Sequence, residues 1–98
     1  MVLEIADIRI DPTKKAEFEK AIERGVRDVI SKSSGFKSFK VQRGVESLDR
    51  YLLMIQWESL EDHMVKFRES PAFAEWRGIV GPFFAGPVAM EHFELVTE

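Results

Sequence analysis

The pattern of apolar and polar positions along the chain predicts four strands and two helices. Strands are expected at residues 2–10, 36–45, 50–57 and 88–96, the middle two forming a hairpin around residues 46–49. A first helix is indicated by apolar residues at helical spacing, namely Phe18, Ile22, Val26, Val29 and Ile30. A second helical segment follows the third strand. The resulting order is β-α-β-β-α-β.

Capping residues mark where these elements begin and end. Asp11-Pro12 favours the start of the first helix, and Ser33-Ser34-Gly35 its end. Ser59, with Asp62 three residues later, begins the second helix as a weak capping box. Ser70-Pro71 restarts this helix, the serine as N-cap and the proline as its first residue. Gly-Pro pairs at residues 81–82 and 86–87 then break the chain before the last strand.

The order of elements predicts an α+β, ferredoxin-like fold, in which a four-stranded antiparallel sheet carries both helices on one face. Residues 1–98 are expected to form a single domain. The strand at 50–57 is apolar on both sides, because Leu53, Ile55 and Trp57 point one way while Leu52 and Met54 point the other. The second sheet face therefore needs a cover. The chain has no third layer, so a homodimer is expected.

Composition excludes several classes of function. The chain is 45% hydrophobic and 32% charged, as in an ordinary globular domain, and its net charge of −3 argues against nucleic-acid binding. No apolar run approaches the roughly 20 residues of a membrane span, and no charged leader precedes an apolar segment, so no membrane association is expected. The absence of cysteine excludes disulfides and thiolate chemistry, and is compatible with the cytoplasmic location that we expect.

A histidine and an arginine interrupt the apolar stripes of the second helical segment. At 100° per residue, His63 shares a stripe with Leu60, Met64 and Phe67. It is a candidate general base, since its near-neutral pKa suits removal of a phenolic proton. The alternative is a histidine at the edge of the core that is hydrogen-bonded to backbone.

Arg77 follows Phe73 and Trp76 on the next stripe, which Val80 completes. It is a candidate for holding a substrate oxyanion. The alternatives are an ion pair with a carboxylate such as Glu91, or a cap on the last carbonyls of the helix.

Further candidates are aromatic or lie on the last strand. His92 alternates with Val88 and Met90 and is either a second proton donor of the pocket or a structural histidine. A flat cavity for an aromatic ligand would be lined by Trp57, Phe67, Phe73, Trp76, Phe83 and Phe84, which otherwise belong to the core. His63 and His92 would need a carboxylate to hold a metal, and no close ligand spacing supports this, so neither metal nor cofactor is expected.

Two stretches resemble the antibiotic biosynthesis monooxygenase (ABM) family, whose members are dimeric α+β barrels. They are W-E-S-L-E-D-H-M-V-K-F-R-E-S-P-A-F-A-E-W-R at residues 57–77 and G-P-F-F-A-G-P-x-x-x-E-H at 81–92. D-P-T-K-K-A-E-F-E-K-A at the first helix extends the resemblance over nearly the whole chain. It implies cofactor-independent oxygenation of a quinol or polyketide-like phenol, whose own anion gives an electron to dioxygen.

The chain departs from two branches that share this fold. The haem-degrading branch uses an Asn on the first strand and a Trp and a His on the second helix, where this chain has Asp7, Lys66 and Trp76. Haem degradation is therefore not expected. Another branch has a His at the position of Lys66, and His63 is displaced from it by three residues. The leading prediction is a cofactorless monooxygenase acting on a small aromatic. The alternative is a non-catalytic module, for ligand binding or stress response, that holds an apolar ligand.

Overall fold

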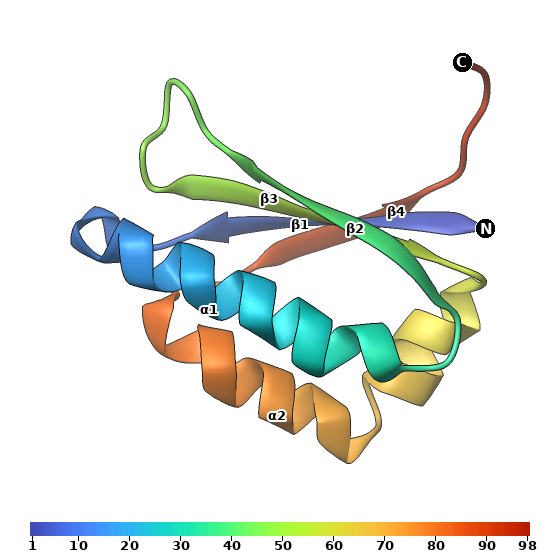
Figure 1. The fold of residues 1–98 in the computed structure, drawn as a ribbon. Helices are drawn as coiled ribbons and strands as arrows, with labels where there is room; N and C mark the ends of the chain where they lie inside the picture. The colour runs from blue at the N-terminus through green and yellow to red at the C-terminus, as the bar shows by residue number, and fades with distance from the viewer.

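The fold is a four-stranded antiparallel sheet with both helices packed on one face (Figure 1). The computed structural model describes residues 1–98. The strands are β1 (Val2–Arg9), β2 (Phe36–Arg43), β3 (Arg50–Trp57) and β4 (Ala89–Phe93), and they lie side by side in the order β2-β3-β1-β4. This is the ferredoxin-like arrangement that the sequence predicts.

The first helix begins and ends close to where the capping residues place it. Asp11 accepts a hydrogen bond from the Thr13 backbone N–H at 2.9 Å and starts a 3₁₀ turn, η1 (Pro12–Lys14), which leads into α1 (Lys15–Asp28). A second 3₁₀ turn, η2 (Ile30–Lys32), follows. The chain then reverses at Gly35, whose φ of +84° is a conformation that favours glycine.

The second helical segment differs from the regular helix expected from the sequence. Residues Asp62–Phe67 form a π-helix, η3, in which Arg68 N–H donates to the carbonyl of His63, five residues earlier, at 3.0 Å. Because a π-turn is wider than an α-turn, the predicted four-residue stripe does not hold. His63 and Phe67 are buried, whereas Leu60 is 48% exposed and Met64 37% exposed.

The later elements agree with the sequence except at their ends. α2 (Pro71–Val80) starts after Ser70 as expected, although the Ser70 hydroxyl donates back to the Phe67 carbonyl and caps no N–H. A 3₁₀ turn, η4 (Gly81–Phe83), follows. β2 and β4 are both shorter than predicted, β4 ending at Phe93, three residues before the expected end. None of the helices combines the length and apolar character that crossing a bilayer requires.

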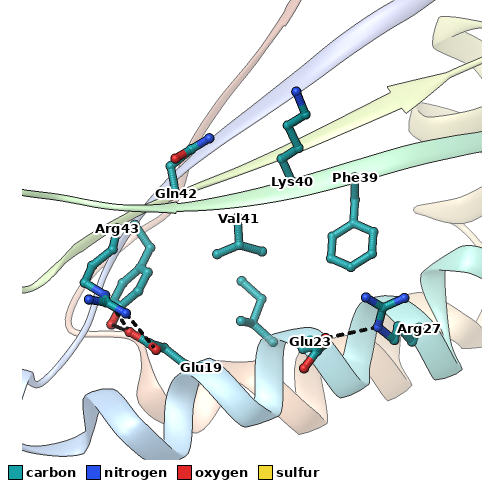
Figure 2. A pocket seen from close by; sticks show the side chains of 10 residues that line it. Glu19, Glu23, Arg27, Phe39, Lys40, Val41, Gln42 and Arg43 are labelled. Carbon is teal, nitrogen blue, oxygen red and sulfur yellow. Dashed lines mark hydrogen bonds and ion pairs between the residues drawn. The ribbon is translucent and has the colours of Figure 1, made fainter.

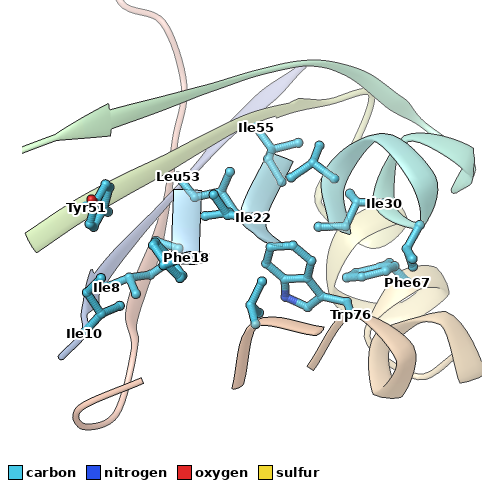
Figure 3. Packing of buried hydrophobic residues seen from close by; sticks show 14 of the residues in the cluster. Ile8, Ile10, Phe18, Ile22, Ile30, Tyr51, Leu53, Ile55, Phe67 and Trp76 are labelled. Carbon is cyan, nitrogen blue, oxygen red and sulfur yellow. The ribbon is translucent and has the colours of Figure 1, made fainter. Parts of the chain in front are cut away.

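The core lies between the sheet and the two helices (Figure 3). Alternate residues of β1 and β3 point into it, including Ala6, Ile8, Leu53, Ile55 and Trp57. The opposite sheet face carries no helix. Its partly covered or exposed apolar side chains are Leu3, Ile5, Leu52, Met54 and Phe93.

Candidate functional site

Two hollows lie near the helices, and their chemistry differs. The larger, of about 550 Å³, is an open groove between α1 and β2 in which Val41 and Phe39 face the helix (Figure 2). Its carboxylates have partners, since Arg43 binds Glu19 at 2.8 Å and Arg27 binds Glu23 at 3.1 Å. Tyr51 also donates to Glu19, at 2.6 Å. The carboxylates of this groove are therefore neutralised, and its buried phenol, Tyr51, keeps its proton near neutral pH because burial and Glu19 raise its pKa to about 12.

The smaller hollow is a cavity of about 310 Å³ between the sheet and the second helical segment. Strands β1 and β3, segments η3 and α2, and the stretch leading into β4 all contribute to it. Its walls are largely aliphatic and aromatic, with Glu4 and His63 as buried polar members. The lining residues are Glu4, Ala6, Ile8, Ile30, Leu53, His63, Phe67, Arg68, Phe73, Trp76, Arg77, Phe84, Gly86, Pro87, Val88 and Met90.

Four side chains form a continuous polar chain at one end of this cavity. Trp57 Nε1–H donates to Glu4 Oε1 at 2.9 Å, and His63 Nε2 lies 3.3 Å from the same oxygen. On its other side, His63 Nδ1 is 2.7 Å from His92 Nε2. Glu4 is 6% exposed and His63 3% exposed, whereas His92 is partly exposed at the sheet edge. The chain thus runs from a buried carboxylate to a ring near the surface.

Burial shifts the protonation of these groups in opposite directions. Loss of hydration raises the pKa of Glu4 to about 7, although the Trp57 hydrogen bond and the charge of Arg68 oppose this rise. Burial lowers the pKa of His63 to about 4, with smaller contributions from His92 and Arg68. The pKa of His92 is also lowered, again mainly by burial. Near pH 7, both imidazoles are therefore neutral and Glu4 exchanges its proton readily.

Two guanidinium groups border the cavity without a carboxylate partner. Arg77 lies over the Phe84 ring, 5.2 Å from its centroid, and Arg68 lies over the Phe73 ring at 4.9 Å. Neither forms a salt bridge, so the ion pair of Arg77 with Glu91, one of the alternatives from sequence, is not present. Both groups remain available to an anionic ligand.

The structure brings together most, but not all, of the residues that the sequence singles out. Phe67, Phe73, Trp76, Arg77 and His63 line the cavity. Three predicted ligand-binding residues do not. Trp57 is fully buried behind His63, with its ring stacked 5.0 Å away. Phe83 packs its edge on Phe18 in the core, at 5.7 Å, and His92 reaches the cavity only through His63.

Glu4 is the residue that sequence reasoning missed. It stands in phase with Ala6 and Ile8 on β1, so the alternation alone places a carboxylate on the core face. The strand position considered instead, Asp7, points to the open face, where Arg50 binds it at 2.7 Å. Lys66, the other position compared between branches, is exposed and pairs with Asp62 at 3.4 Å.

The fold also joins the two histidines that lie far apart in the sequence. The two imidazole rings are directly hydrogen-bonded to each other. No group of three or more His, Cys, Asp or Glu side chains is arranged to hold a metal ion.

Comparisons with known proteins agree with this architecture. The model of the antibiotic biosynthesis monooxygenase family matches residues 1–78. The uncharacterized protein YczJ of Bacillus subtilis (strain 168) is 34% identical over 94 residues, which make up 96% of this chain and 98% of that protein.

Solved structures extend the comparison to the fold. A Bordetella bronchiseptica protein assigned to the antibiotic biosynthesis monooxygenases superposes with a TM-score of 0.92 at 34% identity, over 98% of this chain and 97% of that one. The monooxygenase from the gene ActVA-Orf6 of Streptomyces coelicolor, in complex with the ligand nanaomycin D, gives 0.83 at 21% identity, over 99% and 88% of the two chains. At that identity the likeness concerns the fold alone. With the family model matching most of its length, the chain belongs to the antibiotic biosynthesis monooxygenase family.

Proposed function

We propose that this protein is a cofactor-independent monooxygenase that oxidises a small aromatic, a quinol or polyketide-like phenol, with dioxygen. One observation carries the proposal: an apolar, ring-lined cavity contains a buried carboxylate–imidazole pair, Glu4 and His63. A flat aromatic ligand fits such walls, and a phenol is the kind of group that a buried base deprotonates. Membership of the family supports the same reaction class.

The chemistry requires the substrate to become an anion before it meets dioxygen. The Glu4–His63 pair takes the phenolic proton, and the resulting anion passes an electron to dioxygen, so the substrate itself is the reductant. Arg77 and Arg68 border the cavity and stabilise the negative charge that develops on the substrate. The aromatic walls keep water away from the reactive intermediates.

A substrate panel tests this function. Oxygen uptake is measured with quinols and hydroxyanthrones, each with a matched anaerobic control. We expect at least one compound to be turned over by the purified protein. If a compound binds in the cavity but no compound of the panel causes oxygen uptake, the result would support the non-catalytic, ligand-binding alternative.

His63→Phe tests the base. Phenylalanine retains a ring to stack on Trp57, whereas alanine would leave a void in a fully buried site. Because the substituted ring accepts no proton, turnover should fall by about 100-fold or more while the melting temperature changes little. A fully active His63→Phe enzyme would remove His63 from the mechanism.

Arg77→Ala tests the anion site. Removal of an unpaired guanidinium from the cavity border should weaken binding of the anionic substrate by about 10-fold or more. Arg24→Ala is the matched control, since Arg24 is an exposed arginine of α1 that does not line the cavity. Equal binding by the two variants would exclude Arg77 from the anion site.

We also propose that a second copy of the chain covers the open sheet face. Leu3, Ile5, Leu52 and Met54 form an apolar centre there, since Ile5 pairs with Met54 across β1 and β3, and Leu3 and Leu52 are the next residues on the same face of their own strands. An uncovered apolar sheet face is unfavourable in water. A two-fold dimer brings the same patch of both chains together and leaves the cavity, on the helix side, open to ligand.

A further inference from the structure

The polar chain continues past the cavity, to a histidine that the proposed reaction has not yet used. His92 does not line the cavity, but its Nε2 lies 2.7 Å from His63 Nδ1, and its ring is partly exposed on edge strand β4. A buried base that takes a proton in every turnover must also release it. Glu4 is only 6% exposed, so its own contact with water is small.

We propose that Glu4, His63 and His92 form a proton relay, in which Glu4 takes the proton of the cavity ligand and His92 releases it to solvent. This inference rests on the proposed function, because it assigns the path of the proton that the oxygenation removes. It makes Glu4 the group that exchanges a proton with the ligand and gives both imidazoles the role of carriers.

The distances allow two hydrogen-bond patterns along the chain. With Glu4 as carboxylate, Oε1 accepts from Trp57 Nε1–H and faces His63 Nε2–H at 3.3 Å, so His63 Nδ1 is free to accept from His92 Nε2–H. With Glu4 protonated, its O–H donates to His63 Nε2, and His63 Nδ1–H donates to His92 Nε2. Each pattern leaves both imidazoles neutral.

Moving one proton along the chain converts one pattern into the other. Starting with both imidazoles as Nδ1–H tautomers, a phenol O–H breaks as Glu4 takes the proton, which gives the protonated pattern, and Glu4 passes the proton to His63 Nε2. His63 then gives its Nδ1 proton to His92 Nε2, and His92 releases its Nδ1 proton to water. One proton enters, one leaves, and the negative charge stays on the phenolate. The release leaves the carboxylate pattern, with both imidazoles as Nε2–H, and they return to their Nδ1–H tautomers by proton exchange with water before Glu4 passes on the next proton.

Neutral carriers suit this buried site better than charged ones. Arg68, next in the chain after η3, disfavours an imidazolium on either histidine and favours the Glu4 carboxylate. Arg77 borders the same cavity. A concerted shift along the three groups never leaves a full positive charge on His63, which is 3% exposed.

Imidazole tautomers give a test that needs no substrate. Long-range ¹H–¹⁵N spectra of labelled protein distinguish Nδ1–H from Nε2–H in each histidine. As the pH is lowered and Glu4 becomes protonated, His63 should switch from Nε2–H to Nδ1–H, and His92 should switch in step. Glu4→Gln should abolish the switch. A single His63 tautomer throughout the Glu4 titration would overturn the relay.

A second measurement follows the proton during turnover. His92→Ala should slow oxygenation by about 10-fold or more, and added imidazole should restore part of the rate by filling the vacated position. Glu94→Ala, the same truncation on an exposed residue just past β4, is the control and should leave the rate unchanged. A fully active His92→Ala enzyme would contradict the relay. If no phenol is oxidised by the wild-type protein, the proposed function fails, and the tautomer spectra alone decide whether the proton path exists.

Discussion

At the scale of single residues, burial shifts the pKa values of two groups of the site in opposite directions. Burial makes the charged form of Glu4 unfavourable and raises its pKa from 4.5 to about 7. Burial also makes the charged form of His63 unfavourable and lowers its pKa from 6.5 to about 4. Each shift corresponds to roughly 3 kcal/mol between protonation states. The folded protein therefore keeps both groups neutral in mildly acidic solution.

Glu4→Gln should change the pH dependence of stability. Between about pH 4.5 and 7, folded wild-type protein holds a proton on Glu4 that the unfolded chain has lost, so wild-type stability falls as the pH rises through this window. Glutamine does not titrate, so the stability of the variant does not fall in this way as the pH rises. Relative to wild type, Glu4→Gln should gain up to about 3 kcal/mol from pH 4.5 to 7, measured by urea unfolding at fixed protein concentration.

His63→Phe should show the opposite trend. Below pH 6.5 the unfolded chain binds a proton on His63 that the folded protein does not bind until about pH 4, so wild-type stability falls as the pH falls. The variant should therefore gain stability relative to wild type from pH 6.5 down to 4. If the free energy of unfolding changes with pH in the same way in wild type and both variants, burial does not shift the pKa of either group.

The predictability of the site from sequence differs residue by residue. His63, Phe67, Phe73, Trp76 and Arg77 were found because each lies on, or interrupts, an apolar stripe. Glu4 was missed because a single carboxylate in a strand is usually exposed, and only its phase with Ala6 and Ile8 marks it as inward-facing. The pairing of His63 with His92 depends on a long-range contact between η3 and β4, which no local pattern contains.

At the scale of elements, the order and direction of strands followed from the sequence, whereas local helix geometry did not. Alternation separated Leu53, Ile55 and Trp57 of β3 from Leu52 and Met54 on the opposite face, and the structure shows that the first set faces the core. The π-helix η3 was not foreseen, since hydrophobic spacing cannot distinguish a widened turn over six residues. That widened turn lies where His63 enters the site, and π-bulges often occur at functional sites.

The close approach of α1 to α2 gives a prediction at this scale. A Cβ added at Gly25 would lie 2.8 Å from the Trp76 ring, so Gly25→Ala should force the indole to shift and destabilise the protein by about 1–3 kcal/mol. Gly78→Ala is the matched control. No atom lies within 4 Å of its added Cβ, and alanine is the better helix former, so stability should rise by about 0.5–1 kcal/mol. Thermal unfolding of both variants checks the pair, and equal melting temperatures would contradict the close packing.

At the scale of the whole molecule, the two sheet faces have different roles. One face and the two helices enclose the core and the cavity, so every group of the proton relay lies on the helix side. No helix covers the other face (Figure 1). Apolar side chains lie at its centre. Assembly through this face would close the sheet without obstructing the cavity, which allows the proposed dimer and the proposed catalytic site to be tested independently.

Leu52→Asp tests that separation. Leu52 lies at the centre of the open face, opposite Asp7 on β1 and Gln42 on β2, whereas its neighbour Leu53 is buried in the core. If two copies bury this face, with an interface of about 2,000 Å² or more, a carboxylate there should yield monomers that aggregate or unfold. Val45→Asp makes the same kind of change at a side chain that is 84% exposed in the hairpin loop, and it should leave the assembly intact. Light scattering at micromolar concentration measures both variants. A wild-type protein that is a stable monomer under these conditions would rule out the dimer, and the open face would then be apolar for another reason.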